Sequence, residues 1–312
     1  MPGFLTHYIA GKAAFNAVSS EIQKKISAQE RLYNLGTQGP DIFFYYLPGQ
    51  IRKRSRGIAQ EMHQSRLGLF LTYMARLAKV SATQHEKDTI FAYTAGFIMH
   101  YTVDCHAHPY VYARAFDKNI PKIANSAKHR RFETAIDVAL LKLVSGEKPA
   151  GLNQWELIDA PRKGRYVAAE ALSQGLSAVY NRDVPPRDVH NAMKFTINAT
   201  RLLQSKNGQR KRFMQVLENA TIGESLFSCI IHMQEVSGEE DFLNVKKNPW
   251  HTPWAEAETF NDSFMERYNA AVEEGAELIN IMHEFIYGDL PSVRLAEKLG
   301  NRSLKTGLQC PA

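Results

Sequence analysis

The chain has 312 residues, of which 44% are hydrophobic and 22% are charged, and these fractions are typical of a soluble globular protein with a sizeable core. It contains no run of about 18 apolar residues and no basic start followed by an apolar stretch, so we expect neither a membrane span nor a signal peptide. The net charge of +6 favours anionic partners such as phosphoesters, nucleic acid or anionic lipid.

The three cysteines, Cys105, Cys229 and Cys310, lie far apart in the chain and form no C-x-x-C pair. This usage predicts free thiols in a reducing compartment, and we therefore expect a cytoplasmic location. Cys105 follows Asp104 directly, but a small buried side chain suits it better than a role as zinc ligand.

Residues 1–35 have a helical pattern, in which Thr6 is predicted to cap the first helix and a second short helix ends at Gly36. His7 lies in the first turn and by itself would be interpreted as a surface histidine. Residues 36–48 are predicted to contain a tight loop. The chain leaves this loop at Asp41, just before the aromatic run 43–46. Taken alone, Asp41 would cap the next segment and the aromatic run would belong to the core.

Residues 51–57 read IRKRSRG and are predicted to form a short basic connection. Such a connection is either a solvated loop or a surface that meets an anionic substrate. A helix over residues 56–80 follows and carries His63, and His85 in the next polar stretch is expected to be exposed.

The apolar run 90–97 predicts a buried helix that continues into His100, Asp104 and His108. Residues four apart lie one above another on a helix, so these three side chains form a ladder on nearly one face. An Asp on a buried face is costly unless its charge is compensated, and a divalent metal compensates it when imidazoles lie one turn away. Pro109 is expected to disturb the helix directly after the ladder.

A further helix over residues 126–146 carries His129 and Glu133, again four apart. One such pair would be explained by solvated histidines and an acid paired with Lys or Arg. Two separate pairs of His and carboxylate favour a zinc site. Asp137 is interpreted as an acid that supports the site or lies on the surface, and not as a ligand.

The second half of the chain keeps a helical period, and no alternation of period two is long enough to predict a sheet. We therefore predict an all-α fold. Seven of the eleven histidines precede residue 134, so metal chemistry is assigned to the N-terminal half. The later histidines, His190, His232, His251 and His283, have no carboxylate at metal spacing. The helices expected in this half cover about 164–182, 187–206, 210–235, 254–287 and 290–299.

Taken in order, five motifs resemble the zinc-dependent phospholipase C family, which is all-helical and related to the single-strand-specific zinc nucleases. The motifs are Thr6-His7, Gln38-Gly39-Pro40-Asp41, Met62-His63, His100-x3-Asp104-x3-His108-Pro109 and His129-x3-Glu133. The resemblance covers residues 1–145 and implies a multi-helix bundle around a metal cluster. Residues 146–312 are expected to be a helical continuation that completes the same domain.

The resemblance implies two to three zinc ions per chain. One ion would take Asp41, His63, His100 and Asp104, and a second would take His108, His129 and Glu133. A third would share Asp104 and use His7. Secreted members of the family add an N-terminal tryptophan to this third ion, whereas this chain starts Met1-Pro2-Gly3. We therefore hypothesise that Pro2, once Met1 is removed, replaces the tryptophan; His106 matches no ligand of the family.

The activity implied by the resemblance is phospholipase C-like hydrolysis of a phosphoester by a metal-activated water, with Asp41 orienting or deprotonating that water. A phospholipid head group would be the substrate, and peripheral contact with an anionic membrane could use two basic clusters. These clusters are Arg52, Lys53, Arg54 and Arg56, and Arg210, Lys211 and Arg212; they could also bind a nucleic acid backbone or have no partner.

Two alternatives stay open. The chain could be a zinc-stabilised helical binding protein without catalysis, in which every coordination position is filled by protein. It could also be a zinc nuclease, for which aromatic residues 43–46 would stack on bases.

Overall fold

The computed structural model describes residues 3–44, 49–204, 209, 213, 231, 232, 235 and 240–310. Its elements in chain order are α1 (Phe4–Ala17), α2 (Ser20–Ser27), α3 (Glu30–Gly36), η1 (Gly39–Phe43), α4 (Gly49–Gln64), α5 (Leu67–Val80), α6 (Gln84–Ala115), α7 (Lys122–Ser145), η2 (Pro149–Gly151), α8 (Gln154–Ile158), α9 (Arg162–Tyr180), α10 (Pro186–Leu203), β1 (Trp250–Thr252), β2 (Ala255–Phe260), α12 (Phe264–Tyr287) and α13 (Ser292–Leu299). Within these residues the named strands form one two-stranded antiparallel sheet, and the prediction of an all-α fold is confirmed.

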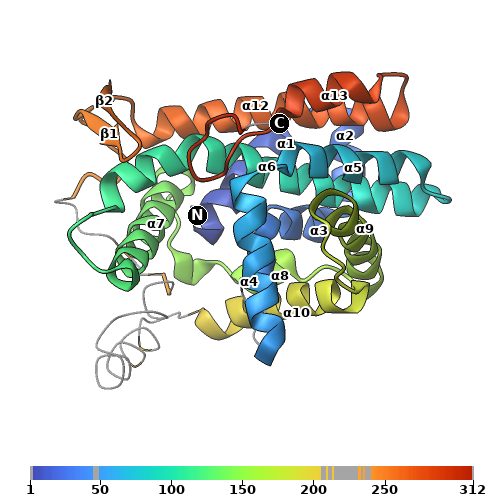
Figure 1. Ribbon diagram of the computed structural model, residues 1–312, viewed down its shortest axis with the longest axis horizontal. Coiled ribbons are helices and arrows are strands. Elements are labelled where there is room, and N and C mark those ends of the chain that lie inside the picture. Colours follow the sequence, from blue (N-terminus) through green and yellow to red (C-terminus); the bar gives the residue numbers. More distant parts are fainter. Residues whose placement is uncertain are drawn as a thin grey trace.

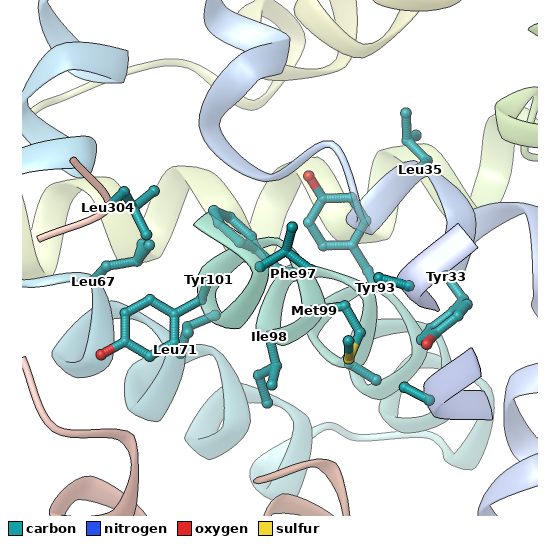
Figure 2. Close-up of a cluster of buried hydrophobic side chains, with 14 of the residues drawn as sticks. Tyr33, Leu35, Leu67, Leu71, Tyr93, Phe97, Ile98, Met99, Tyr101 and Leu304 are labelled. Atoms are coloured by element: carbon teal, nitrogen blue, oxygen red, sulfur yellow. The ribbon is translucent and has the colours of Figure 1, made fainter. Parts of the chain in front are cut away.

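The long helix α6 is the centre of the fold. Helices α3, α5 and α12 pack against it, and α12 runs along one side of the molecule while α10 lies on the other (Figure 1). Buried apolar side chains of α6 form a cluster with side chains of α3 and α5 and with Leu304 of the C-terminal segment (Figure 2). Tyr93, Phe97 and Ile98 of α6 are completely buried, as expected for a helix that is enclosed on all sides.

Helices α3 and α6 approach so closely that their backbones touch. A Cβ atom added at Gly96 would come within 2.0 Å of the carbonyl oxygen of Tyr33, and one added at Gly36 would come within 2.2 Å of the carbonyl oxygen of Tyr93. Only glycine, which has no Cβ, allows this separation. The close contact matters for function because α6 carries the His100 ladder and α3 leads directly into η1.

We predict that Gly96→Ala lowers the free energy of unfolding by about 3 kcal/mol, because the clash is with backbone that cannot move aside. Gly164→Ala on α9 is the matched control, since its added Cβ would meet only Leu32 Cδ2 at 3.7 Å and Gln29 Oε1 at 4.0 Å. Urea unfolding of the two variants measures the difference. Equal stability of both variants would show that the two helices can separate without loss.

The predicted helix over residues 56–80 is wrong in one respect, because it is two helices, α4 and α5, separated at Arg66. Arg66 has a left-handed φ of 64°. Its backbone N–H donates to Asn301 Oδ1 at 2.6 Å, and a Cβ at Gly68 would lie 1.7 Å from the carbonyl oxygen of Gly300. The C-terminal segment therefore packs into the break, which local sequence does not indicate. The basic stretch 51–57, predicted as a connection, is part of α4.

Three further expectations are corrected at helix ends. Helix α1 begins at Phe4 with Gly3 as N-cap, so Thr6 is not the cap. Helix α6 continues through Pro109 to Ala115. Helix α12 begins at Phe264, after a capping box of Ser263 and Glu266, and the preceding residues form the β1–β2 hairpin instead of helix.

The remaining predicted helices agree within a few residues with α9, α10 and α13. The predicted helix over 210–235 lies almost wholly outside the described residues. Among the helices that the structure describes, none combines the length and apolar character needed to cross a membrane.

Candidate metal centre

The first helix carries His7 and is held in place by Asp137 of α7. The two carboxylate oxygens of Asp137 accept hydrogen bonds from the backbone N–H groups of Leu5 (3.0 Å) and Thr6 (2.8 Å), and one of them also accepts from Thr6 Oγ1 (2.6 Å). A buried carboxylate at a helix N-terminus satisfies free N–H groups and complements the helix dipole. Asp137 thereby fixes the start of α1, one turn before the imidazole of His7.

The turn between α3 and η1 brings Asp41 beside His100. Gly39 has a left-handed φ of 49°, and a Cβ at this position would lie 2.4 Å from His100 Cγ. Glycine therefore allows the chain to turn against the imidazole, and Asp41 follows two residues later in η1. Asp41 is 5% exposed and His100 is fully buried.

Asp104 is the central residue of the cluster. Its Oδ1 lies 3.3 Å from His7 Nε2, and its Oδ2 lies 3.2 Å from His100 Nε2. Oδ2 also lies 3.8 Å from His63 Nε2 and 3.7 Å from His108 Nδ1. His63 in turn places its Nε2 3.3 Å from Asp41 Oδ1. Four imidazoles from α1, α4 and α6 thus surround one buried carboxylate.

The other end of the ladder meets α7. His108 Nε2 lies 3.7 Å from Glu133 Oε1, and His129 Nε2 lies 2.7 Å from the same oxygen. Together the cluster contains three groups that could each hold a metal ion: His7, His100 and Asp104; Asp41, His63 and His100; and His108, His129 and Glu133. All eight residues that the sequence proposed as ligands therefore come together, with His100 common to two groups.

Backbone carbonyls fix three of the imidazoles. His63 Nδ1 donates to the carbonyl of Ala59 at 2.6 Å, His100 Nδ1 donates to that of Thr37 at 3.0 Å, and His108 Nδ1 donates to that of Leu304. A carbonyl only accepts, so Nδ1 carries the proton and Nε2 of the neutral ring keeps its lone pair. Metal-binding histidines are commonly oriented in this way. Sequence analysis missed these partners because a carbonyl has no side-chain signature.

The C-terminal segment completes this arrangement. Besides accepting from His108, Leu304 donates its N–H to the carbonyl of His63 at 2.9 Å, and Ser303 Oγ donates to the same carbonyl at 3.2 Å. Arg302 holds the segment through an ion pair with Glu274 of α12. The candidate ligands His63 and His108 thus depend on residues that lie 196 or more positions away in the sequence.

Deleting residues 303–312 is expected to lower zinc affinity about 10–100-fold, the usual effect of losing a partner that orients a metal ligand. Competition with a chromogenic chelator measures the affinity. Deleting residues 310–312 is the control, because it leaves Leu304 and the hydrogen bond between Ser303 N–H and the carbonyl of Leu308 in place. Unchanged affinity in the longer deletion would mean that Leu304 does not determine the orientation of His108.

Protonation states in the cluster favour cation binding. Burial would raise the pKa of Asp104, but His108 and His100 hold that pKa well below its usual range. The pKa of Glu133 is also lowered, because His129 and His108 outweigh the effect of burial. Burial lowers the pKa of His7 and brings that of His108 to about 4. At neutral pH these four groups thus present anionic oxygens and neutral nitrogens.

His100 differs from the other histidines. Burial acts to lower its pKa, but the nearby carboxylates Asp104 and Asp41 outweigh this and raise it. Without a cation, His100 therefore tends to hold a proton between the two acids. A metal ion that binds His100 Nε2 releases this proton, as metal binding to protonated ligands generally does.

The residues fit zinc in both chemistry and spacing. A tetrahedral zinc ion with bonds of about 2.05 Å separates its ligand atoms by about 3.3 Å. The pairs His7–Asp104, His100–Asp104 and His63–Asp41 are separated by 3.3, 3.2 and 3.3 Å. Among the described residues, Nε2 of His7, His63, His100 and His108, Oδ1 of Asp41 and both oxygens of Asp104 are buried without a hydrogen-bond partner. Such buried atoms are costly unless a bound ion satisfies them.

Other residues singled out in the sequence do not join the cluster. His106 pairs with Glu274 at 2.7 Å, and His232 pairs with Asp137 at 2.7 Å. Of the aromatic run, Phe43 is buried and Phe44 lies 5.4 Å from His63, measured between ring centroids. Tyr45, Tyr46, Met1 and Pro2 lie outside the described residues, as do the side chains of both basic clusters.

These features define an all-helical protein built around a buried centre of histidine and carboxylate side chains. The family model described as zinc dependent phospholipase C matches residues 6–184, which include all eight residues of the cluster. This chain belongs to the zinc-dependent phospholipase C family. A search of curated proteins and a search of solved structures each gave no match.

Proposed function

We propose that the chain is a zinc-dependent phosphoester hydrolase that cleaves phosphodiesters, with a phospholipid head group as substrate. The observation that carries this proposal is the spacing of about 3.3 Å between ligand atoms in three pairs around Asp104 and Asp41. The match to the family over residues 6–184 supports the same conclusion. Two to three zinc ions per chain are part of the proposal.

The eight residues would divide between the ions as two groups that share His100, and a third group of His108, His129 and Glu133. When bound, zinc supplies Lewis acidity, which lowers the pKa of a coordinated water and offsets charge on the phosphoryl oxygens. Asp104 lies between these two groups and could contact both ions, since Oδ1 faces His7 of one group and Oδ2 lies 3.8 Å from His63 of the other.

Asp41 is the residue proposed to act on the attacking water. A purely structural zinc site is complete with four protein ligands, and Asp41 adds a carboxylate to a cluster that already has His63, His100 and Asp104. Its Oδ1 is buried and, within the described residues, has no hydrogen-bond partner. An ionised carboxylate in this position can orient the water and accept its proton during attack on phosphorus.

The proposal is tested on metal-loaded protein with three substrates: a phosphatidylcholine vesicle, a soluble phosphodiester and single-stranded DNA. We expect release of the phosphorylated head group, with no cleavage of DNA. Preferential cleavage of DNA would favour the zinc nuclease, for which Phe44 near His63 would provide a stacking surface. Turnover of none of these substrates, with zinc bound, would favour a helical binding protein without catalysis.

A cytoplasmic location and peripheral contact with an anionic membrane also belong to this proposal. Cys105 and Cys310 carry free thiols, which supports a reducing compartment. Fractionation of cells expressing the tagged chain, with and without a high-salt wash, tests both points. Recovery of the chain outside the cell would contradict the proposed location.

A further inference from the structure

Residues of α9 and α10 line a polar cavity. In Figure 1, α10 lies on the side of the molecule opposite α12. It has a volume of about 320 Å³, within the range of small-molecule sites. Its lining residues are Arg162, Arg165, Tyr166, Arg187, His190, Asn191 and Lys194. None of them belongs to the metal centre, whose residues come from α1, η1, α4, α6 and α7.

The cavity gathers positive charge that the described residues do not neutralise. Arg165 pairs with Asp159 at 3.0 Å. Among the described residues, Arg162, Arg187 and Lys194 have no carboxylate within ion-pair distance, and all three are exposed to solvent. Cations held together in one cavity repel one another, and a bound anion removes this repulsion.

Two residues that line the cavity, His190 and Arg165, also have buried polar atoms without partners among the described residues. His190 is 7% exposed, and its Nε2 has no hydrogen-bond partner among the described residues. The same is true of Arg165 Nε, although Nη1 of that side chain bonds to Asp159. The ring of Tyr166 packs on His190 with centroids 4.7 Å apart and holds the imidazole in place. Buried atoms of this kind are normally satisfied, so a polar group bound in the cavity would offset part of the cost of leaving them unpaired.

The positive charge around the cavity affects the pKa of His190. Burial lowers the pKa of His190, and the neighbouring Arg165, Arg162 and Lys194 lower it further. Guanidinium groups match phosphate oxygens with paired hydrogen bonds, and an excess of three cations suits a dianion better than a carboxylate.

We propose that this cavity binds a phosphate monoester group, at a site separate from the metal centre. The phosphate oxygens accept hydrogen bonds from the arginines of α9 and α10, and His190 forms part of the cavity wall beside them. The group belongs either to a soluble phosphorylated compound or to the head group of an anionic lipid such as phosphatidic acid. The site does not depend on the proposed hydrolysis, because it shares no residue with the metal centre.

The test compares Arg162→Gln/Arg187→Gln with the control Lys24→Gln/Lys118→Gln, which removes the same charge from exposed positions on α2 and in the loop after α6. Calorimetric titration of the zinc-loaded proteins with inorganic phosphate should show two binding events in the wild type and in the control. The event in the α9–α10 cavity should weaken about tenfold or more in the first variant, since it loses hydrogen bonds to charged groups. Asp104→Asn should lose the other event, at the metal centre, and keep this one.

Equal phosphate binding by the wild type and both variants would overturn the proposal. An equal loss of binding in both variants would also overturn it, because it would indicate only nonspecific attraction.

The source of the phosphate is distinguished by sedimentation with phosphatidylcholine vesicles that contain phosphatidic acid. Vesicle binding that Arg162→Gln/Arg187→Gln loses and the control keeps identifies a lipid head group. Binding of soluble phosphate with no vesicle association in any of the three proteins identifies a soluble ligand. Hydrolysis by the first variant should remain at the wild-type rate, so this experiment can fail independently of the proposed function.

Discussion

Asp104→Asn is expected to reduce phosphoester hydrolysis by more than about 100-fold while leaving the helical content nearly unchanged. Loss of a partner that only orients a metal ligand costs 10–100-fold, and Asp104 is placed to contact two ions directly. Its two oxygens face His7 and His100 at 3.3 and 3.2 Å. The amide keeps the shape of the side chain, but it removes the negative charge and replaces one acceptor with a donor.

Turnover, zinc content by elemental mass spectrometry and far-UV circular dichroism should be measured on the same sample. Asp88→Asn is the matched control, because it makes the same change on the same helix, where Asp88 pairs with Lys25 outside the cluster. The control is expected to keep zinc and activity. Full turnover by Asp104→Asn would rule out the proposed mechanism.

Removal of zinc by a chelator is expected to abolish activity and to lower the melting temperature by about 10 °C. A ligand that binds only the folded state stabilises it by about 4 kcal/mol when present at 1,000 times its dissociation constant, and several ions act together here. Without them, the buried Asp104 is left among four imidazoles with no hydrogen-bond partner in the described residues.

Thermal melts before and after chelation, and again after zinc is restored, measure this effect together with zinc content per chain. Two to three zinc ions per chain and a melting temperature that recovers are the expected results. Chelation of Asp104→Asn should change its melting temperature much less. One zinc ion per chain would favour a structural site. Protein that binds no zinc and keeps the same melting temperature after chelation would contradict the proposal that the cluster binds zinc.

Much of the cluster could be predicted from local sequence, because its ligands occur at helical spacing. His100, Asp104 and His108 lie on α6 one turn apart, as the pattern of four predicts, and His129 and Glu133 repeat this on α7. The helices themselves were predictable wherever apolar residues recur with the helical period. The predicted helix boundaries are wrong where contacts with a distant segment determine the backbone conformation, as at Arg66 between α4 and α5.

The sequence by itself determined the all-helical class and the residue types of a candidate metal centre, since both follow from short-range periodicity. The tertiary structure brings His7, Asp41 and His63 to His100, a grouping for which the sequence offered only a family resemblance, and it alone shows that Leu304 orients His108. It also decided that four cations of α9 and α10 share one cavity with His190. These juxtapositions depend on how helices pack and on backbone carbonyls, and neither leaves a periodic pattern in the sequence from which it could be read.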